Sequence, residues 1–417
     1  SGCVRLPEAY DNPYLLVRNL AFQQFYLHHR SPYSFAMGRL GRNQLLFGSL
    51  PSAHPFQADF ARITGLTISQ FLELSMTLVC RFLVEGERSL TVDWLEPAQR
   101  NYPPGTTQRF LDALSRDRSS VTEWLRSAAG SHSLACELYE ESPLQRYPLL
   151  REGNVYHCYS SLLLMHSISF FVYRMLRDSD PQVFMRLFGP LFEQHVRRGV
   201  DYLGLPYDDE RELISKLGRG CKVVDFVISD GSHRVFVDAK GVEMTYLGQT
   251  SHDPSIVSNK AKDSFLKGLC QAYSTARALN QRGEASTGDN YLLIVTFREL
   301  FLSNGQAFRD YVDAEAVDRI VRKFGGAEWV PLRNVFCCSV DDWDRFVQCC
   351  ARKRYLGPAQ LLREYVRADA RSARKMKFVF GYHVEESHPS PDEPRYLRSA
   401  AETVWKRVRN WFPNTSH

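Results

Sequence analysis

Three charged residues lie inside a stretch that otherwise has the composition of a buried β-hairpin. The stretch is CKVVDFVISDGSHRVFVDAKG, residues 221–241, in which two apolar runs flank the turn-forming residues SDGS. Asp225 lies within the first run, and Asp238 and Lys240 end the second. A buried charge is costly unless it is paired or binds a ligand, so these three side chains are the first candidates for chemistry.

The alternation of side chains along a strand places Asp238 and Lys240 on the same face. Asp225 lies beside them if the two strands pair in register. Two converging carboxylates repel each other, and a bound divalent cation removes the repulsion. Mg²⁺ is held by one or two carboxylates together with water and phosphate oxygens, and a nearby lysine stabilises charge that develops on a phosphate. The residue types therefore predict a Mg²⁺ site, with Mn²⁺ as a substitute, that hydrolyses phosphodiesters. A structural salt bridge between Asp225 and Lys240 is the alternative.

The spacing of these residues, D-x12-D-A-K, resembles the signature of the PD-(D/E)XK superfamily of restriction-endonuclease-like nucleases. Val224 stands where the strict signature has proline. The resemblance covers residues 181 to 300 and implies an α/β fold with an α-β-β-β-α-β core. It also implies that Asp225 and Asp238 bind the metal and that Lys240 is catalytic.

The resemblance extends to the helices on either side of the hairpin. Glu193, in GPLFEQHV, precedes the hairpin, and Lys267 and Gln271, in FLKGLCQAY, follow it. By resemblance, Glu193 contributes to the metal site, while Lys267 and Gln271 orient the lysine or contact the phosphate. Lys267 and Gln271 are also one helical turn apart, so a solvated helix face is the alternative for this pair.

Helical and strand patterns alternate around these residues, which favours an α/β sheet layered with helices. Phe184, Phe188, Phe192 and Val196 recur every four residues and predict a helix with one buried face. The sequence then predicts strands at 221–229 and 233–240, a helix at 259–282, and strands at 290–300 and within NVFCCSV. Ser339 is expected to cap the helix that follows the last of these strands.

The whole chain divides by composition into three ranges. Residues 1–180 are expected to form a mainly helical accessory region, 181–350 the nuclease domain and 351–417 a basic C-terminal extension. Thr67 and Gln70 have the spacing of a capping box. The segment FARITGLTISQFLEL containing them is interpreted as two packed helices, with a DNA-reading helix-turn-helix as the alternative. The uncharged run 155–173 is interpreted as a buried core helix rather than a membrane span.

The C-terminal extension carries a cluster of basic residues that predicts contact with nucleic acid. Its members proposed to bind nucleic acid are Arg371, Arg374, Lys375 and Lys377. Further on, RYLRSAAETVWKRVRNWF has an apolar face formed by Leu397, Val404, Val408 and Trp411. A terminal helix docked through that face is the first interpretation of this second segment, and nucleic-acid contact is the alternative.

Composition sets limits on partners and compartment. The formal net charge of +5 permits a polyanionic partner without requiring one. The 10 cysteines include two adjacent pairs and no C-x-x-C spacing, which predicts reduced, buried thiols in a cytoplasmic protein. The first residues lack an apolar signal-peptide segment, and no membrane association is expected.

The function predicted from these features is metal-dependent hydrolysis of phosphodiester bonds, with DNA as the expected substrate and endonucleolytic cleavage. RNA cleavage is one alternative, and a catalytically silent nucleic-acid-binding or scaffold protein of the same fold is another. The large helical region beside such a core resembles bacterial phage-defence nucleases, which suggests an antiviral role. A homodimer is expected if both strands of a duplex are cut.

Overall fold

The computed structural model describes residues 12–24, 32–128, 143–352, 357–371, 379–387 and 393–411. The chain is a mixed α/β protein with two mixed sheets. It divides into two compact units. Unit 1 contains residues 1–25 and 188–392, and unit 2 contains residues 26–187 and 393–417. Each unit is therefore assembled from segments that lie far apart in the sequence.

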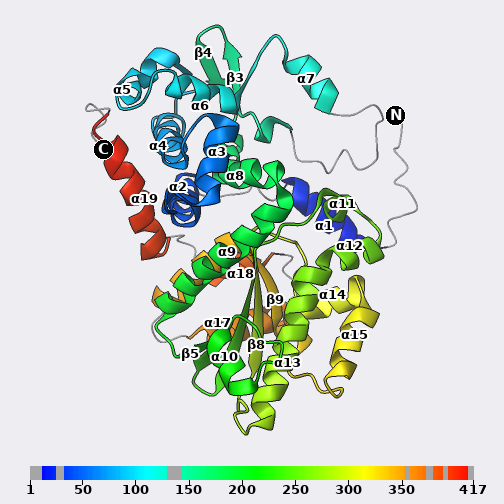
Figure 1. The fold of residues 1–417 in the computed structure, drawn as a ribbon. Coiled ribbons are helices and arrows are strands. Elements are labelled where there is room, and N and C mark those ends of the chain that lie inside the picture. The colour runs from blue at the N-terminus through cyan, green and yellow to red at the C-terminus, as the bar shows by residue number, and fades with distance from the viewer. Residues whose placement is uncertain are drawn as a thin grey trace, which may run out of the picture. The chain divides into compact units, whose positions relative to one another are not determined.

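Unit 1 is built around a five-stranded sheet with the strand order β5-β6-β7-β8-β9 (Figure 1). The first three strands are antiparallel neighbours, whereas β7, β8 and β9 run parallel. The strands are β5 Tyr207–Asp209, β6 Phe226–Asp230, β7 His233–Lys240, β8 Asn290–Thr296 and β9 Val335–Ser339.

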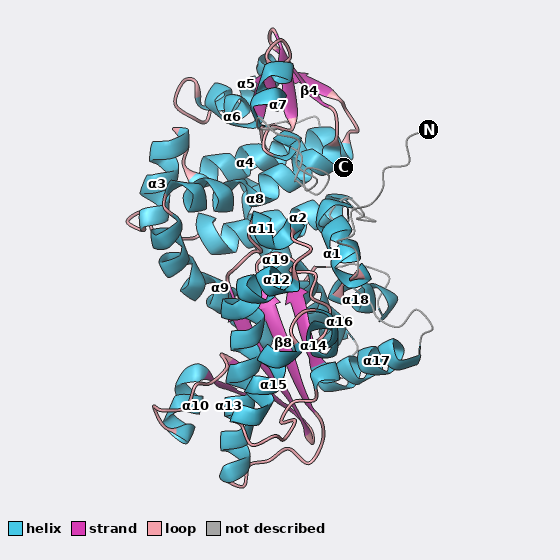
Figure 2. Cartoon of the chain, turned by 90° about the vertical axis from the view of Figure 1, so that its right-hand side faces the viewer, coloured by secondary structure: helices cyan, strands magenta, loops and turns pink. Residues whose placement is uncertain are grey.

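Helices cover both faces of this sheet (Figures 1 and 2). One face carries α13, whose apolar side chains join a buried cluster with Phe236 of β7 and with Leu292 and Ile294 of β8. The other face contacts α16 and α17. The helices of unit 1 are α1 Pro13–Gln24, α9 Pro181–Leu203 (shared with unit 2), α10 Glu210–Leu217, α11 Tyr246–Thr250, α12 Pro254–Ala261, α13 Lys267–Gln281, α14 Gly305–Tyr311, α15 Ala314–Lys323, α16 Val340–Arg352, α17 Pro358–Arg371 and α18 Phe380–Ser387; a π-turn, η7 Lys262–Leu266, joins α12 to α13, and a 3₁₀ turn, η8 Leu332–Asn334, precedes β9.

Most of the elements expected around the hairpin are present. The four recurring apolar residues of α9 are all buried. The hydroxyl of Ser339 accepts a hydrogen bond from the N–H of Asp342 and caps α16, as predicted. The adjacent cysteines Cys337, Cys338, Cys349 and Cys350 are buried free thiols, in agreement with their interpretation.

The first strand of the hairpin is shorter than predicted, because β6 begins at Phe226 rather than at residue 221. The backbone before it is satisfied by α13 instead of by a strand. The N–H of Val224 donates to the hydroxyl of Thr275, and the carbonyl of Val223 accepts from the amide of Gln271. Side chains distant in sequence therefore decide where this strand starts.

Unit 2 is mainly helical and carries the second sheet, with the order β1-β4-β3-β2. Its helices are α2 Pro32–Asn43, α3 Pro55–Thr64, α4 Ile68–Val79, α5 Glu96–Gln99, α6 Thr106–Leu114, α7 Val121–Ala128, α8 Ser161–Ser179 and α19 Arg395–Val408, with π-turns η2 Gln44–Gly48 and η3 Cys80–Val84 and 3₁₀ turns η4 Val92–Leu95 and η6 Pro143–Gln145; its strands are β1 Ser89–Thr91, β2 Ser115–Asp117, β3 Leu149–Glu152 and β4 Val155–Cys158.

The capping box at the start of α4 is confirmed. The N–H of Thr67 donates to the side chain of Gln70, and the N–H of Gln70 donates to the hydroxyl of Thr67. Ten of the 12 residues of α4 are buried, among them Phe71 and Leu74. A helix enclosed in this way offers no free face to a DNA groove, which supports the interpretation as two packed helices.

The interpretation of residues 155–173 as one helix is wrong for its first part. Residues 155–158 form β4, which pairs with β1 and β3, and α8 begins only at Ser161. The hydroxyl of Ser160 accepts a hydrogen bond from the N–H of Leu163 and caps the helix at that point. Among the described residues no single helix has both the length and the apolar composition to cross a bilayer; α3 and the α4–η3 helix meet these criteria only together, across a bend of 62°.

The C-terminal helix α19 packs within unit 2, where it contacts α2 and α4. Leu397, Val404 and Val408 are buried, as expected for a docked helix. At Gly41 of α2 there is no room for a side chain, because a Cβ atom would collide with the carbonyl of Leu397. The glycine therefore permits backbone contact between two segments about 350 residues apart in the sequence.

Candidate metal-binding acidic site

Asp238 and Lys240 lie on the same face near the carboxyl end of β7, as their spacing predicts. The Asp238 side chain is fully buried, and only 11% of the Lys240 side chain is exposed. The Lys240 ammonium lies 2.6 Å from Oδ2 of Asp238. Oδ1 of Asp238 has no hydrogen-bond partner within the described part of the chain. A buried carboxylate with one unsatisfied oxygen is costly, so it is suited to bind a cation.

Asp225 precedes β6 directly and reaches the same end of the sheet. Phe226 pairs with Val237, so Asp225 comes next to the D-A-K segment on the neighbouring strand. Its Oδ2 atom accepts a hydrogen bond of 2.6 Å from the N–H of Ala239. This hydrogen bond fixes the carboxylate between Asp238 and Lys240.

Gln271 connects three parts of the site. Its Oε1 atom accepts a 3.1 Å hydrogen bond from the Lys240 ammonium, while its amide donates to the carbonyl of Val223. Lys267 lies one turn earlier on α13 and is exposed, with no hydrogen-bond or ion-pair partner among the described residues. Lys267 acts on the site through space. Its positive charge partly offsets the burial that raises the pKa of Asp238.

A third acidic residue, Glu210, joins Glu193 and Asp225. Carboxylate oxygens of these three residues all lie within 4.8 Å of one another. Glu193 comes from α9 and Glu210 is the first residue of α10. Arg197 contacts Glu193 at 4.0 Å and Asp209 at 2.9 Å, which links the two helices beside the cluster.

Glu210 was not expected from the sequence, because its surroundings have a simpler explanation. Asp209 and Glu212 form a capping box at the start of α10. Acidic residues are common in the first turn of a helix, where they interact favourably with the helix dipole. Only the fold, which brings the start of α10 to Asp225, gives Glu210 a second role.

The carboxylates of the site are held in an environment that disfavours their charge. Burial, and after it the charge of Asp238, raises the pKa of Asp225 to about 7. Burial also raises the pKa of Asp238 although Lys240 opposes the shift. The pKa of Glu193 is raised by burial and by Glu210. Lys240, Lys267 and Arg197 offset part of this effect, yet the pKa values of Asp225, Asp238 and Glu193 all stay raised, so a bound cation would relieve the remaining repulsion.

The residues present fit Mg²⁺ or Mn²⁺. The donors are carboxylate oxygens, which these hard cations prefer, and the fully buried Asp238 has an unpartnered oxygen. The ion pair in the structure joins Lys240 to Asp238, not to Asp225 as the salt-bridge alternative proposed. Lys240 is therefore not paired with Asp225, whose carboxylate lies in the cluster with Glu193 and Glu210.

The side chains of the basic residues expected to bind nucleic acid are not described by the structure. Arg371 is the last residue of α17, and its side chain is not described. Arg374, Lys375 and Lys377 lie outside the described residues. Their role in nucleic-acid binding stays a prediction.

Comparison with family models, with curated proteins and with solved structures gives no match to this chain.

Proposed function

We propose that unit 1 is a metal-dependent nuclease that hydrolyses phosphodiester bonds and has a restriction-endonuclease-like core. The observation that carries the proposal is the buried pair Asp238–Lys240 beside Asp225 at one end of the sheet. The order of α9, β5, β6, β7, α13 and β8 supports it, because it follows the α-β-β-β-α-β sequence of such cores, with α10 inserted between β5 and β6 and with α11 and α12 between β7 and α13. DNA is the proposed substrate, and anti-phage defence is the proposed setting.

The metal would be held by the cluster of Asp225, Glu193 and Glu210, with Asp238, which lies outside that cluster but beside Asp225, as a further carboxylate. Bound Mg²⁺ supplies neutralisation of phosphate charge and activation of a water molecule. The three clustered carboxylates and the unpartnered oxygen of Asp238 support this assignment.

The remaining polar groups position one positive charge. Asp238 and Gln271 both contact the Lys240 ammonium, which fixes the direction of a side chain that is otherwise flexible. An ammonium held in a mostly buried position stabilises negative charge on a phosphate more strongly than one in free solvent. Lys267, exposed one turn away, supplies a second cation on the approach of the substrate.

Cleavage assays on labelled DNA and RNA test the proposal. We expect the wild-type protein to cut in Mg²⁺ or Mn²⁺ and not in excess EDTA. Lys240→Met leaves a buried carboxylate without its partner, so the double variant Asp238→Asn/Lys240→Met is the cleaner test. The single variant Lys240→Met and the double variant should each reduce cleavage by about 100-fold or more. Lys260→Met, which removes an exposed charge from α12, is the matched control and should cut normally.

The measured melting temperature separates catalysis from folding. If the double variant keeps its melting temperature and loses cleavage, the site is catalytic. If it keeps both, the buried pair has no catalytic role and the proposal is wrong. A wild-type protein that binds DNA or RNA but cuts neither in any metal identifies the catalytically silent alternative.

A further inference from the structure

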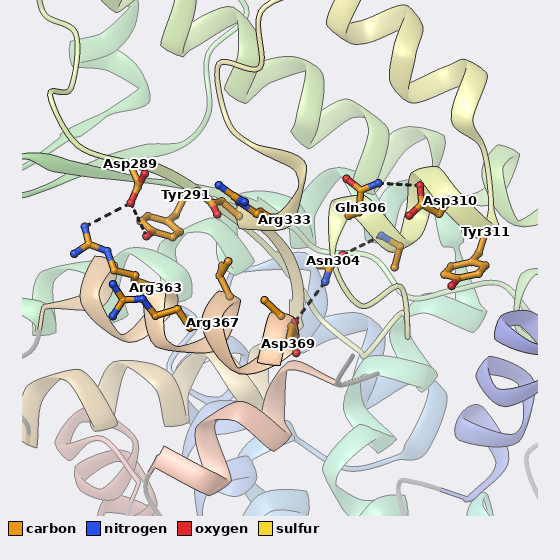
Figure 3. A pocket seen from close by; sticks show the side chains of 14 residues that line it. Asp289, Tyr291, Asn304, Gln306, Asp310, Tyr311, Arg333, Arg363, Arg367 and Asp369 are labelled. Carbon is orange, nitrogen blue, oxygen red and sulfur yellow. Dashed lines mark hydrogen bonds and ion pairs between the residues drawn. The ribbon is translucent and has the colours of Figure 1, made fainter. Parts of the chain in front are cut away.

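Unit 1 contains a hollow, which we call the α14–α17 groove. It has a volume of about 920 Å³. Its walls come from α14, η8 and α17, and Tyr291 of β8 lies beside Asp289 at one end of it (Figure 3). A volume of this size falls within the range of about 300–1,000 Å³ that is usual for small-molecule sites.

The α14–α17 groove is separate from the acidic site. Tyr291 lies near the start of β8, whereas Thr296, which pairs with Lys240, ends it. Five residues of strand span about 16 Å. Tyr291 also points to the opposite face from Ile294, the partner of Asp238, because the two positions differ by an odd number. The groove therefore lies at the other end and on the other face of the sheet.

The carboxylates of the groove are already engaged. Asp289 lies 3.5 Å from Arg363, and Asp310 lies 3.7 Å from Arg309. Asp369 lies 3.2 Å from Nε2 of His383. These contacts reduce the negative charge that the groove presents to a ligand.

Two arginines of the groove have no such partner. Arg333, from η8, and Arg367, from α17, are exposed and form no ion pair or hydrogen bond within the described part of the chain. They lie on either side of Tyr291, with Arg363 one turn before Arg367 on α17 (Figure 3). Arginine binds phosphate through paired N–H donors, so the groove has unused capacity for a phosphate group.

An aromatic surface lies at the other end of the groove. Tyr311 is 45% exposed, and its ring stacks on Tyr14 with centroids 5.2 Å apart and planes 10° apart. The polar side chains of Asn304 and Gln306 lie between this ring and the arginines (Figure 3). A fixed aromatic ring is suited to stack with a base. Asn304 already bonds to Asp369 and Ala307, and the amide N–H of Gln306 donates to Asp310, which leaves the carbonyl oxygen of the exposed Gln306 for the polar edge of a base.

We propose that the α14–α17 groove binds a nucleoside phosphate. Arg333 and Arg367 bind the phosphate, and Tyr311 contacts the base. The groove has the size of a small-molecule site and is too small for a duplex, so we assign it to a free nucleotide. This proposal does not depend on the nuclease activity.

Calorimetric titration with AMP, GMP, CMP and UMP tests this site in the full chain. We expect at least one nucleotide to bind, and Arg333→Ala/Arg367→Ala to weaken that binding by at least 10-fold. These arginines have no partner, so their removal strands no buried group. Arg395→Ala/Arg398→Ala removes the same charge from the exposed face of α19 and should bind as the wild type does. Lys240→Met should also bind normally, whatever its effect on cleavage.

Three results would overturn the proposal. These are no binding of any of the four nucleotides, binding that survives in Arg333→Ala/Arg367→Ala, and inorganic phosphate binding as tightly as the nucleotides. The last result would mean that Tyr311 and Gln306 make no contact with a base. Tyr311→Ala checks the same point, because it should weaken nucleotide binding and leave the binding of inorganic phosphate unchanged.

Discussion

Asp225 illustrates how burial prepares a side chain to bind a cation. Its carboxylate accepts a hydrogen bond from Ala239 and lies beside Asp238, and burial with this neighbour raises its pKa to about 7. In an unfolded chain an aspartate titrates near pH 4. The folded protein therefore retains a proton that the unfolded chain loses between about pH 4 and pH 7, and the free energy of unfolding falls as the pH rises through this interval.

The pH dependence of metal stabilisation follows from this shift. Without metal, the contribution of Asp225 to stability is fully present below pH 4 and lost above pH 7. Mg²⁺ competes with the proton, so the metal should raise the melting temperature more at pH 8 than at pH 5.5. Calorimetric melting with Mg²⁺ or EDTA at both pH values measures the difference. Asp225→Asn should remove most of it; an equal Mg²⁺ effect at both pH values would show that Asp225 does not bind the metal.

At the scale of elements, the close packing of α13 on β7 determines the geometry of the site. A Cβ atom at Gly268 would lie 2.8 Å from Oδ2 of Asp238 and 3.0 Å from Cγ1 of Ile294. The absence of a side chain lets the helix carry Gln271 to hydrogen-bonding distance of Lys240. The position of α13 and the geometry of the acidic site therefore both depend on Gly268.

Gly268→Ala tests this coupling. The added methyl group must displace α13 or Asp238, so we expect a loss of about 1–3 kcal/mol in the free energy of unfolding, together with reduced cleavage. Gly220→Ala is the matched control. Gly220 lies in the turn after α10 with open space around its Cβ position and no positive φ, so alanine there should stabilise by about 0.4–1 kcal/mol. Urea unfolding of the two variants compares them, and a Gly268→Ala protein as stable as the wild type would mean that the helix moves without cost.

At the scale of the whole molecule, basic segments differ in what they can offer to nucleic acid. On α19 the apolar face is buried within unit 2, and Arg395, Arg398 and Lys406 are exposed. The cluster Arg371, Arg374 and Lys375 begins at the last residue of α17 and belongs to unit 1, which also holds the acidic site. We therefore expect the α17 cluster to contribute more to substrate binding than α19.

Salt dependence of duplex DNA binding distinguishes the two segments. Replacing Arg371, Arg374 and Lys375 by alanine should weaken binding and reduce the slope of log K against log salt by about 0.9 for each lost phosphate contact. Arg395→Ala/Arg398→Ala/Lys406→Ala removes the same charge and should leave the slope unchanged. Fluorescence anisotropy at several salt concentrations provides both slopes. Equal slopes for the wild type and the α17 variant would assign that cluster to another role.

Local patterns in the sequence determined much of the hairpin and its flanking elements. Asp238 and Lys240 share a face because side chains alternate along any strand. The capping box of Thr67 and Gln70 and the cap at Ser339 form because each depends on residues no more than three positions apart. Contacts of this range are encoded almost completely by composition and spacing.

The tertiary structure decided which distant groups meet. Glu210 approaches Asp225 only because β5 places the start of α10 next to β6. Gln271 satisfies both Val223 and Lys240, which shortens β6 and fixes the lysine. These contacts join residues 15 to 48 positions apart, whose distance depends on how helices pack on the sheet. The local periodicity of the sequence determines the face of a strand or helix on which a side chain lies. The packing of helices on the sheet determines which distant side chains it contacts.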